Sequence, residues 1–399
     1  MESATPFDVE ELRRDWIADW SGDDFYREVR AVRASLINAD RTCVLCEEDP
    51  LAFSCRFFAA VSLGLPVALA NPRWRDAELM AFRRLLESGP ADPGAILIPT
   101  GGTTGGIKLA IHNWQSLHAG ARATQDFLGG GPIHSSCVLP LHHVSGLMQL
   151  VRSFVSGGTI RFDENEVAGR CLSLVPTQLQ RAMQSNKSIQ KMNTSAVIFV
   201  GGAAMPESVR ERARELRLPV VPVYGMTETA AMTAAVPKQE FSADAKAGAI
   251  PLGDACIQVD SAGAVRIRSS SLFQGYFGRE ALDLSEGFQT SDLGRMDERG
   301  RLHLLGRLDA LINTGGEKVD PAEVRAALQA IESIDGAQVI GEPDDEWGEK
   351  VIAYVQPSRG ATLDEAAIRA VLKERLSSFK IPKEIRLAGG PPGTAGSRQ

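Results

Sequence analysis

The chain has 399 residues, 44% hydrophobic and 23% charged, a composition typical of a globular protein with two or three domains. Its 43 Lys and Arg against 50 Asp and Glu give a formal net charge of −7, which argues against a general nucleic-acid binder because no excess of positive charge faces a phosphate backbone. Six cysteines in a chain of this length exclude a disulfide scaffold.

The first residues predict neither a secretory leader nor a membrane anchor. The acidic segment 8–11 stands where a signal peptide would carry its basic and apolar regions. The longest uncharged apolar stretch, 57–70, contains Gly64 and Pro66 and is too short to cross a bilayer. We therefore expect a cytoplasmic protein with no membrane span.

The first 250 residues alternate apolar helices with short apolar strands. Residues 53–63 predict a buried helix that ends at Gly64, and Asn113 is expected to cap a second helix. Strands are predicted at 42–45, 66–70, 96–99, 196–200 and 220–223. This alternation indicates an α/β fold with mostly parallel sheets, in which ligands bind at the carboxyl ends of the strands.

The pattern changes after residue 250 to short β elements followed by a small α+β segment. A hairpin is predicted around residues 298–300. Asp320 and Pro321 have the spacing of a helix start, a second helix is expected from 362, and strands are predicted at 337–340 and 351–355. We predict a large N-terminal domain over 1–306 and a small hinged C-terminal α+β domain over 307–399.

Residues 99–108 form a loop of glycine and threonine that ends at Lys108. Its successive backbone N–H groups, three hydroxyls and one lysine suit a cluster of phosphate oxygens. The loop differs from a Walker loop, because Ile107 occupies the lysine position and 109–112 is predicted to be a strand rather than a helix. A structural turn without a ligand is the alternative.

Residues 223–229 place an aromatic ring, a hydroxyl and a carboxylate after a buried strand. Tyr224 can stack on a purine, Thr227 can bind a phosphate, and Glu228 can bind Mg²⁺ together with phosphate oxygens. A surface turn with an incidental glutamate is the alternative.

Four segments, 100–108, 224–228, 290–294 and 306–309, occur in an order and at a spacing that resemble the adenylate-forming enzymes: acyl-CoA synthetases, luciferases and peptide-synthetase adenylation domains. The resemblance extends from about residue 40 to residue 388. It implies an enzyme that uses ATP, Mg²⁺ and coenzyme A to convert an acid first to an acyl-adenylate and then to a thioester. Neither step needs a protein nucleophile, so positioning and charge stabilisation carry the catalysis.

The resemblance also implies roles for individual residues. The loop over the β- and γ-phosphates comprises Thr100, Gly101, Gly102, Thr103, Thr104, Gly105 and Lys108. The nucleotide base is bound by Gly201, Gly202, Ala203, Tyr224, Gly225 and Met226. Thr227 contacts the α-phosphate, Glu228 binds Mg²⁺, and Asp292 binds the ribose with help from Arg307. Asp309 is the implied hinge, and Gly315 and Gly316 approach coenzyme A.

The segment 139–147, with 152–154 and 175–179, resembles the 2-succinylbenzoate–CoA ligases of menaquinone and phylloquinone synthesis. The carboxylate of this substrate that is not activated needs a cation or several donors. The implied acid-binding residues are His142, His143, Ser145, Gly146 and Arg152. We expect His143 to line the pocket and His142 to pack beneath it. A surface salt bridge is the alternative for Arg152.

One segment departs from the family pattern. Relatives carry a lysine near the C-terminus that contacts the reacting groups during adenylation, and here Ser397 follows Gly396 instead. Arg398 is the candidate substitute, although arginine and lysine are not interchangeable at a close contact, and Lys380 and Lys383 are the alternatives. This departure indicates weakened adenylation or an altered C-terminal segment. The alternatives to a 2-succinylbenzoate ligase are an aryl- or medium-chain acyl-CoA ligase, a weakened protein that binds an acyl-adenylate, and a peptide-synthetase adenylation module.

Overall fold

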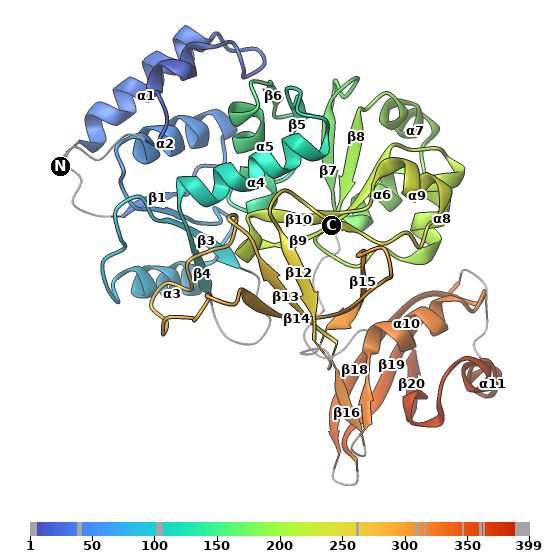
Figure 1. Ribbon diagram of the computed structural model, residues 1–399. Coiled ribbons are helices and arrows are strands. Elements are labelled where there is room, and N and C mark those ends of the chain that lie inside the picture. The colour runs from blue at the N-terminus through green and yellow to red at the C-terminus, as the bar shows by residue number, and fades with distance from the viewer. Residues whose placement is uncertain are drawn as a thin grey trace. The chain divides into compact units, whose positions relative to one another are not determined.

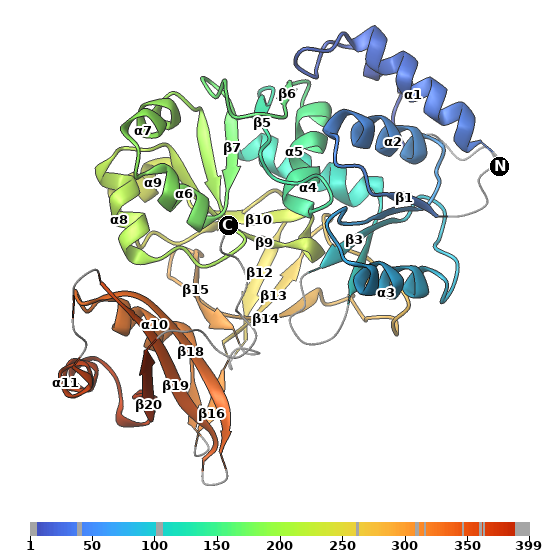
Figure 2. The same ribbon diagram turned by 180° about the vertical axis from the view of Figure 1, so that it is seen from behind.

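The computed structural model describes residues 6–37, 42–100, 107–260, 263–307, 311–314, 317–344, 347–358, 361 and 364–387. Two compact units make up the chain, drawn from opposite sides in Figures 1 and 2. The large unit comprises residues 1–258, 266–289 and 296–303, and the small unit comprises residues 259–265, 290–295 and 304–399.

The first sheet of the large unit has the strand order β1-β2-β3-β4. Its strands are β1 (Cys43–Leu45), β2 (Val67–Leu69), β3 (Ile96–Thr100) and β4 (Lys108–His112). The first three are parallel, and β4 returns antiparallel to β3. Strands were predicted at the positions of β1, β2 and β3. The structure also confirms that a strand, not the helix of a Walker loop, follows the glycine-rich segment.

Helices α1 (Gly22–Leu36), α2 (Pro50–Ser62) and α3 (Asp76–Leu86) accompany this sheet, with the 3-10 helix η1 (Val9–Arg13) before them. The predicted helix 53–63 is α2, which begins three residues earlier. Asp49 accepts a hydrogen bond from the Ala52 amide, and Pro50 occupies the first turn, where its missing N–H costs nothing.

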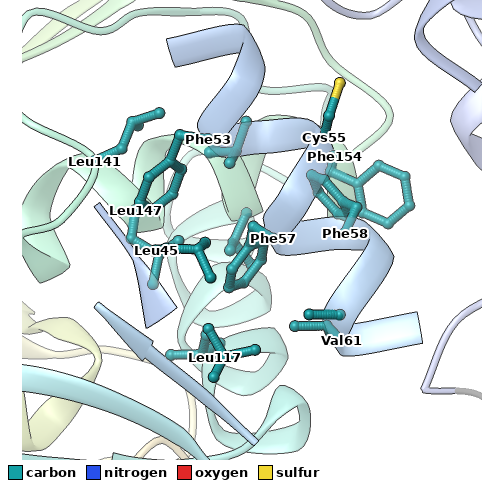
Figure 3. Close-up of a cluster of buried hydrophobic side chains, with 14 of the residues drawn as sticks. Leu45, Phe53, Cys55, Phe57, Phe58, Val61, Leu117, Leu141, Leu147 and Phe154 are labelled. Atoms are coloured by element: carbon teal, nitrogen blue, oxygen red, sulfur yellow. The ribbon is translucent and has the colours of Figure 1, made fainter. Parts of the chain in front are cut away.

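The core of this part of the large unit is a cluster of aromatic side chains around α2. Figure 3 shows Phe58 beside Phe154, and Phe57 among Leu45, Leu117 and Leu147. Phe58 is fully buried, and its ring centroid lies within 6.3 Å of those of Phe7, Trp16, Phe25, Phe57, Trp114 and Phe154. Most of these pairs are edge-to-face or tilted, the geometry that aromatic quadrupoles favour.

The second sheet of the large unit has the order β11-β10-β9-β8-β7-β5-β6. Its strands are β5 (Ser135–Ser136), β6 (Ile160–Arg161), β7 (Cys171–Leu174), β8 (Val197–Val200), β9 (Val220–Met226), β10 (Ala231–Ala235) and β11 (Ile250–Pro251). The five strands from β9 to β6 are parallel, as predicted, and β10 and β11 are antiparallel additions.

The helices of this region are α4 (Trp114–Phe127), α5 (Val144–Val155), α6 (Pro176–Ala182), α7 (Asn186–Asn193), α8 (Glu207–Glu215) and α9 (Lys238–Ala243). Asn113 caps α4 as predicted, with its Oδ1 accepting from the Ser116 amide at 2.9 Å. The predicted strand 220–223 is too short: β9 continues to Met226, because β10 pairs with residues 223–226. Tyr224 and Gly225 are therefore strand residues rather than loop residues.

Strands β12 (Cys256–Val259), β13 (Ala264–Arg268), β14 (Phe288–Met296) and β15 (Leu302–Arg307) form a third sheet in that order and contribute residues to both units. The predicted hairpin at 298–300 is the turn from β14 to β15. It closes with Gly300 at a φ of 70°, a left-handed value that glycine adopts without strain.

The rest of the small unit is a sheet of order β17-β16-β19-β18, with β20 pairing β19. Its elements are β16 (Ile312–Thr314), β17 (Glu317–Val319), α10 (Pro321–Gln329), β18 (Ile334–Asp344), β19 (Gly348–Pro357), α11 (Glu365–Arg375), the 3-10 helix η4 (Ser378–Lys380) and β20 (Glu384–Leu387). Alternate residues of β19, Val351, Ala353 and Val355, pack in one core with the apolar faces of α10 and α11. Strands β18 and β19 are longer than predicted because they pair along almost their whole length.

The structure confirms the α/β class and the predicted elements of a smaller C-terminal α+β part. Within its described ranges, none of the helices is both long and apolar enough to span a bilayer.

Phe58→Ala should lower the free energy of unfolding of the large unit by about 3–5 kcal/mol, because it removes a fully buried ring and leaves a cavity among six aromatic neighbours. Thermal and urea-induced unfolding followed by circular dichroism measure this loss. Met80→Ala on α3, whose side chain is 51% exposed, is the control and should change stability little. Equal effects of the two substitutions would contradict the prediction.

Candidate functional site

The carboxyl ends of β7, β8 and β9 lie next to one another, which places three of the predicted segments at one edge of the second sheet. The Gly201 amide, just after β8, donates to the carbonyl of Leu174, the last residue of β7. A side chain at Gly201 would collide with Val223 of β9, with a Cβ–Cγ2 distance of 2.6 Å. Gly202 adopts a φ of +78°, and the exposed Ala203 follows it. This edge is where parallel α/β sheets bind ligands.

Tyr224 and Gly225 are held firmly by pairing between β9 and β10. Tyr224 is only 8% exposed, whereas Gly225 and Met226 are partly exposed. A Cβ on Gly225 would lie 1.6 Å from the Ala231 carbonyl oxygen, so close backbone packing alone requires glycine there. The predicted contacts of these residues with a nucleotide base remain predictions.

A single 3-10 turn, η2 (Thr227–Thr229), presents Thr227 and Glu228 directly after β9. The Thr229 hydroxyl accepts from the Met226 amide at 3.0 Å, and Ala230 ends the turn in the left-handed region at a φ of 50°. Glu228 is 9% exposed, and its Oε1 accepts a hydrogen bond of 2.7 Å from the Tyr276 hydroxyl. Burial, together with this carboxylate, raises the pKa of Tyr276, so the hydroxyl keeps its proton.

His112, the last residue of β4, fixes the same turn from the first sheet. Its Nε2 lies 2.7 Å from the Thr227 carbonyl oxygen, and its Nδ1 lies 2.9 Å from the Ser116 hydroxyl. A carbonyl only accepts, so Nε2 carries the proton and the neutral ring accepts at Nδ1. Full burial lowers the pKa of His112 to about 4, which keeps the ring neutral near pH 7.

The glycine-rich loop joins β3 to β4 at two residues that face each other. Thr100 pairs with Lys108, so the strands meet where the loop leaves and returns. Lys108 is exposed, with its Nζ 5.7 Å from the centroid of the Tyr276 ring. The predicted phosphate-binding residues Gly101, Gly102, Thr103, Thr104 and Gly105 lie outside the described residues.

Glu228 has the chemistry of a Mg²⁺ ligand in a nucleotide site. Among residues the structure describes, no three His, Cys, Asp or Glu side chains form a cluster that could enclose a metal. Mg²⁺ in nucleotide-dependent enzymes is usually held by one or two carboxylates, with phosphates and waters completing the shell. A single partly accessible carboxylate, with one oxygen already accepting from Tyr276, fits that arrangement.

The two histidines of the predicted acid-binding segment lie at the head of α5. Their ring centroids are 4.4 Å apart, with His142 8% exposed and His143 exposed, in line with the expectation that His142 packs beneath. Burial, then His143 and Arg73, lowers the pKa of His142 to about 4. Partial desolvation also lowers the pKa of His143. Both rings are therefore neutral near pH 7 and can accept or donate one hydrogen bond at each nitrogen.

Helix α5 carries a stripe of polar residues along a mostly apolar, buried surface. Ser145, Gln149 and Arg152 have the spacing i, i+4, i+7 that puts them on one face. The Gln149 amide nitrogen donates to the Ser145 carbonyl at 3.1 Å. Gly146 lets the first turn pass close to the Pro140 carbonyl, which a Cβ would meet at 2.1 Å.

Arg152 ends this stripe as a buried cation, and two of its three nitrogens lack an acceptor among the described residues. It is 3% exposed, and its Nε and Nη2 have no hydrogen-bond partner in the described part of the chain. The same holds for Oε1 of the 2% exposed Gln149. Burial lowers the pKa of Arg152 to about 10, so it is still charged near pH 7. The alternative that Arg152 forms a surface salt bridge is therefore wrong, because its side chain is buried.

Asp292 and Arg307, both in the small unit, form an ion pair. Arg307 Nη1 lies 3.2 Å from Asp292 Oδ1, and Asp292 is 9% exposed. The predicted hinge Asp309 and the predicted coenzyme A contacts Gly315 and Gly316 lie outside the described residues.

Lys380 and Lys383, the alternatives considered for the lysine that relatives carry near the C-terminus, also belong to the small unit. Lys380 forms an ion pair with Glu323 at 2.7 Å, and Lys383 lies 3.9 Å from the Trp347 ring centroid. Gly396, Ser397 and Arg398 are outside the described residues.

Three residues at this site were missed in the sequence. Tyr276 and His112 are hydrogen-bonded to a turn that is 48 and 115 residues away in the chain, and no local spacing predicts such partners. Gln149 could have been found, because it falls between Ser145 and Arg152 at helical spacing on an apolar helix.

Comparison with known proteins identifies the family. The profile of the AMP-binding enzyme family matches residues 81–277, and that of the AMP-binding enzyme C-terminal domain matches residues 323–395. The 2-succinylbenzoate–CoA ligase of Enterococcus faecalis is 31% identical over 82% of this chain and 72% of its own length. That of Geobacillus kaustophilus is 32% identical over 79% and 69%.

The fold is also that of a solved relative. The o-succinylbenzoate CoA synthetase of Bacillus subtilis, in complex with the acyl-adenylate intermediate OSB-AMP, superposes with a TM-score of 0.79 at 22% identity, covering 94% of this chain and 91% of that one. The resemblance drawn from four sequence motifs is thereby confirmed. The chain belongs to the AMP-binding enzyme family of adenylate-forming enzymes.

Proposed function

We propose that this protein is an AMP-forming ligase that joins 2-succinylbenzoate to coenzyme A at the expense of ATP. The observation that carries the choice of acid is Arg152, a buried guanidinium with two unpartnered nitrogens at the end of the polar stripe on α5. An uncompensated buried charge is costly, and a second carboxylate on the substrate would offset it. Relatives covering most of the chain bear the name of this activity.

In the first step, a carboxylate oxygen of the acid attacks the α-phosphorus of ATP. The bond from that phosphorus to the bridging oxygen breaks, and pyrophosphate leaves with the electron pair. Thr227, which begins the turn η2, would donate to the α-phosphate, and Glu228 would hold Mg²⁺. Mg²⁺ bound with the nucleotide offsets the negative charge on the phosphates. Lys108 adds a cation at the base of the glycine-rich loop.

In the second step, the sulfur of coenzyme A attacks the acyl carbon of the adenylate. The acyl–oxygen bond breaks, AMP departs with the electron pair, and the thiol proton is released. We propose that the chain works as a large part, 1–306, and a small part, 307–399, which turns about Asp309 between the steps. The ion pair of Asp292 with Arg307 supports a role for both in holding the ribose, because it orients the carboxylate.

The acid pocket follows the polar face of α5. The stripe from Ser145 to Arg152 is about 10 Å long, seven residues at 1.5 Å each. The activated carboxylate would lie at the His143 end, at the head of α5, and the second carboxylate at Arg152. A simple fatty acid would leave Arg152 and Gln149 without partners, which disfavours the medium-chain alternative.

Glu228→Gln should lower acid-dependent exchange between pyrophosphate and ATP by about 100-fold, because the amide removes the charge that binds Mg²⁺. Raising the Mg²⁺ concentration should restore part of the activity. Glu286→Gln, at an exposed position of the same unit, is the matched control and should behave as wild type. Full activity of Glu228→Gln at low Mg²⁺ would remove Glu228 from the site.

Arg152→Met should raise the KM for 2-succinylbenzoate on the order of 30-fold or more, since losing one member of a buried charge pair costs about 2 kcal/mol or more. The KM for ATP should change little. The same substitution should raise the melting temperature without substrate, because an apolar side chain of similar length replaces a buried cation with two nitrogens that lack acceptors among the described residues. Thioester formation detected by mass and thermal unfolding give the two measurements.

Arg210→Met is the matched control for this prediction. Arg210 is also partly buried in the large unit, but its Nε donates to the Ala245 carbonyl at 2.6 Å. Its replacement should lower the melting temperature and leave the KM for the acid unchanged. If Arg152→Met lowers stability in the same way and keeps the wild-type KM, Arg152 is a structural residue and not an acid ligand.

A further inference from the structure

We propose that Tyr276 is a positioning residue that orients Glu228 for Mg²⁺ and aligns it with Lys108. This inference rests on the proposed function and assigns to that site a residue outside its four motifs. Tyr276 interacts with both groups. Its hydroxyl lies 2.7 Å from Glu228 Oε1, and the centroid of its ring lies 5.7 Å from Lys108 Nζ.

The hydrogen bond to Glu228 is directional and engages one oxygen only. Tyr276 donates to Oε1, and Oε2 accepts no such bond from the described part of the chain. A carboxylate held by one oxygen loses much of its freedom to rotate, so the other oxygen is pre-oriented for a metal ion. Partners of this kind, one shell behind a metal ligand, typically contribute 10- to 100-fold in metal affinity.

The Tyr276 backbone is anchored on the strand that carries Lys108. The Gln274 amide donates to the Ile111 carbonyl at 2.7 Å, and the Ile111 amide returns a bond to the Gly275 carbonyl at 2.9 Å. The Phe277 amide donates to the Leu109 carbonyl at 2.9 Å. Residues 274–277 therefore run beside β4 as an additional extended segment, which fixes where the tyrosine ring starts.

Residues 273–276 also form hydrogen bonds to the turn that carries Glu228. The Phe273 amide donates to the Glu228 backbone carbonyl at 2.9 Å, so Glu228 is held through its main chain and its carboxylate by residues three apart. The Phe273 ring packs edge-to-face on Tyr276, with centroids 4.9 Å apart, and restricts the tilt of the phenol. His112, at the end of β4, also holds the Thr227 carbonyl.

The ring of Tyr276 gives Lys108 a fixed neighbour. A lysine ammonium within about 6 Å of an aromatic centroid is attracted to the ring face. Lys108 is exposed, so this attraction biases the side chain without locking it. Tyr276 thereby joins the start of β4, where the glycine-rich loop ends, to the carboxylate that would hold Mg²⁺.

Tyr276→Phe tests this inference, because it removes only the hydroxyl and keeps the ring. Calorimetric titration with ATP is performed at several Mg²⁺ concentrations and in EDTA. The Mg²⁺ concentration needed for half-maximal ATP affinity should rise about tenfold in the variant. Affinity for ATP in EDTA should equal that of wild type, because the variant alters the metal ligand and not the nucleotide pocket.

Tyr26→Phe is the matched control. It also removes a phenol hydroxyl that donates to a glutamate, Glu10, but at the N-terminal helices. Its Mg²⁺ dependence should be that of wild type. A second comparison uses Glu228→Gln as background, in which adding Tyr276→Phe should cause no further change in Mg²⁺ dependence.

The outcomes separate this inference from the proposed function. Suppose that wild type binds ATP with Mg²⁺ and that Tyr276→Phe shows the same Mg²⁺ dependence; the positioning role is then wrong and the ligase proposal stands. The same conclusion follows if Tyr276→Phe loses as much affinity for ATP in EDTA as it does with Mg²⁺. If the two substitutions add fully in the double variant, Tyr276 does not act through Glu228. If wild type shows no binding of ATP with Mg²⁺, both proposals fail together.

Discussion

The arrangement of this site depends on one constraint: the turn that carries Thr227 and Glu228 is bonded to β4 and to the segment beside it. His112 holds the Thr227 carbonyl, and Tyr276 holds the Glu228 carboxylate. Since β4 begins at Lys108, the end of the glycine-rich loop and the carboxylate-bearing turn share one rigid support. A reaction whose catalysis consists of positioning phosphates against charges requires such a support, because small displacements of the charged groups are costly.

Helix α5, along which we propose that the acid binds, shows how a binding site can be placed inside a stable core. Most of α5 is buried and apolar, and its neighbours form a close-packed cluster around Phe58 and Phe154. Within that surface, Gln149 and Arg152 leave polar atoms without partners. Such groups destabilise the free protein, and a dicarboxylic acid would recover part of that cost on binding. Selectivity against acids with a single carboxylate then follows from the penalty of leaving Arg152 unpaired.

Local sequence signals predicted most of the elements and the chemistry of the motifs. Asn113 was recognised as the cap of α4 because capping depends on the next three residues only. The cap at Asp49 was not recognised, and α2 was therefore predicted to begin three residues too late. The strand after the loop was predictable from residues 109–112. The extension of β9 to Met226 was not, because it comes from pairing with β10. Tyr276 and His112 could not be predicted as parts of the site for the same reason, because their hydrogen-bond partners lie far away in the sequence.

The comparison of two glycines shows why a motif alone does not define a binding site. Gly201 and Gly225 fall in segments that resemble nucleotide-binding motifs, yet each is required by the atoms around it. A side-chain carbon of Val223 and the Ala231 carbonyl, respectively, occupy the space that a Cβ would need. Glycine at these two positions is therefore explained by close packing, without a ligand. The buried polar atoms of Arg152 and the singly bonded carboxylate of Glu228 are different, because close packing gives no reason for them. The functional inference therefore rests on groups whose presence the fold does not explain. Here these groups are the charges of Arg152, which a second carboxylate on the acid would complement, and of Glu228, which Mg²⁺ bound with the nucleotide would complement.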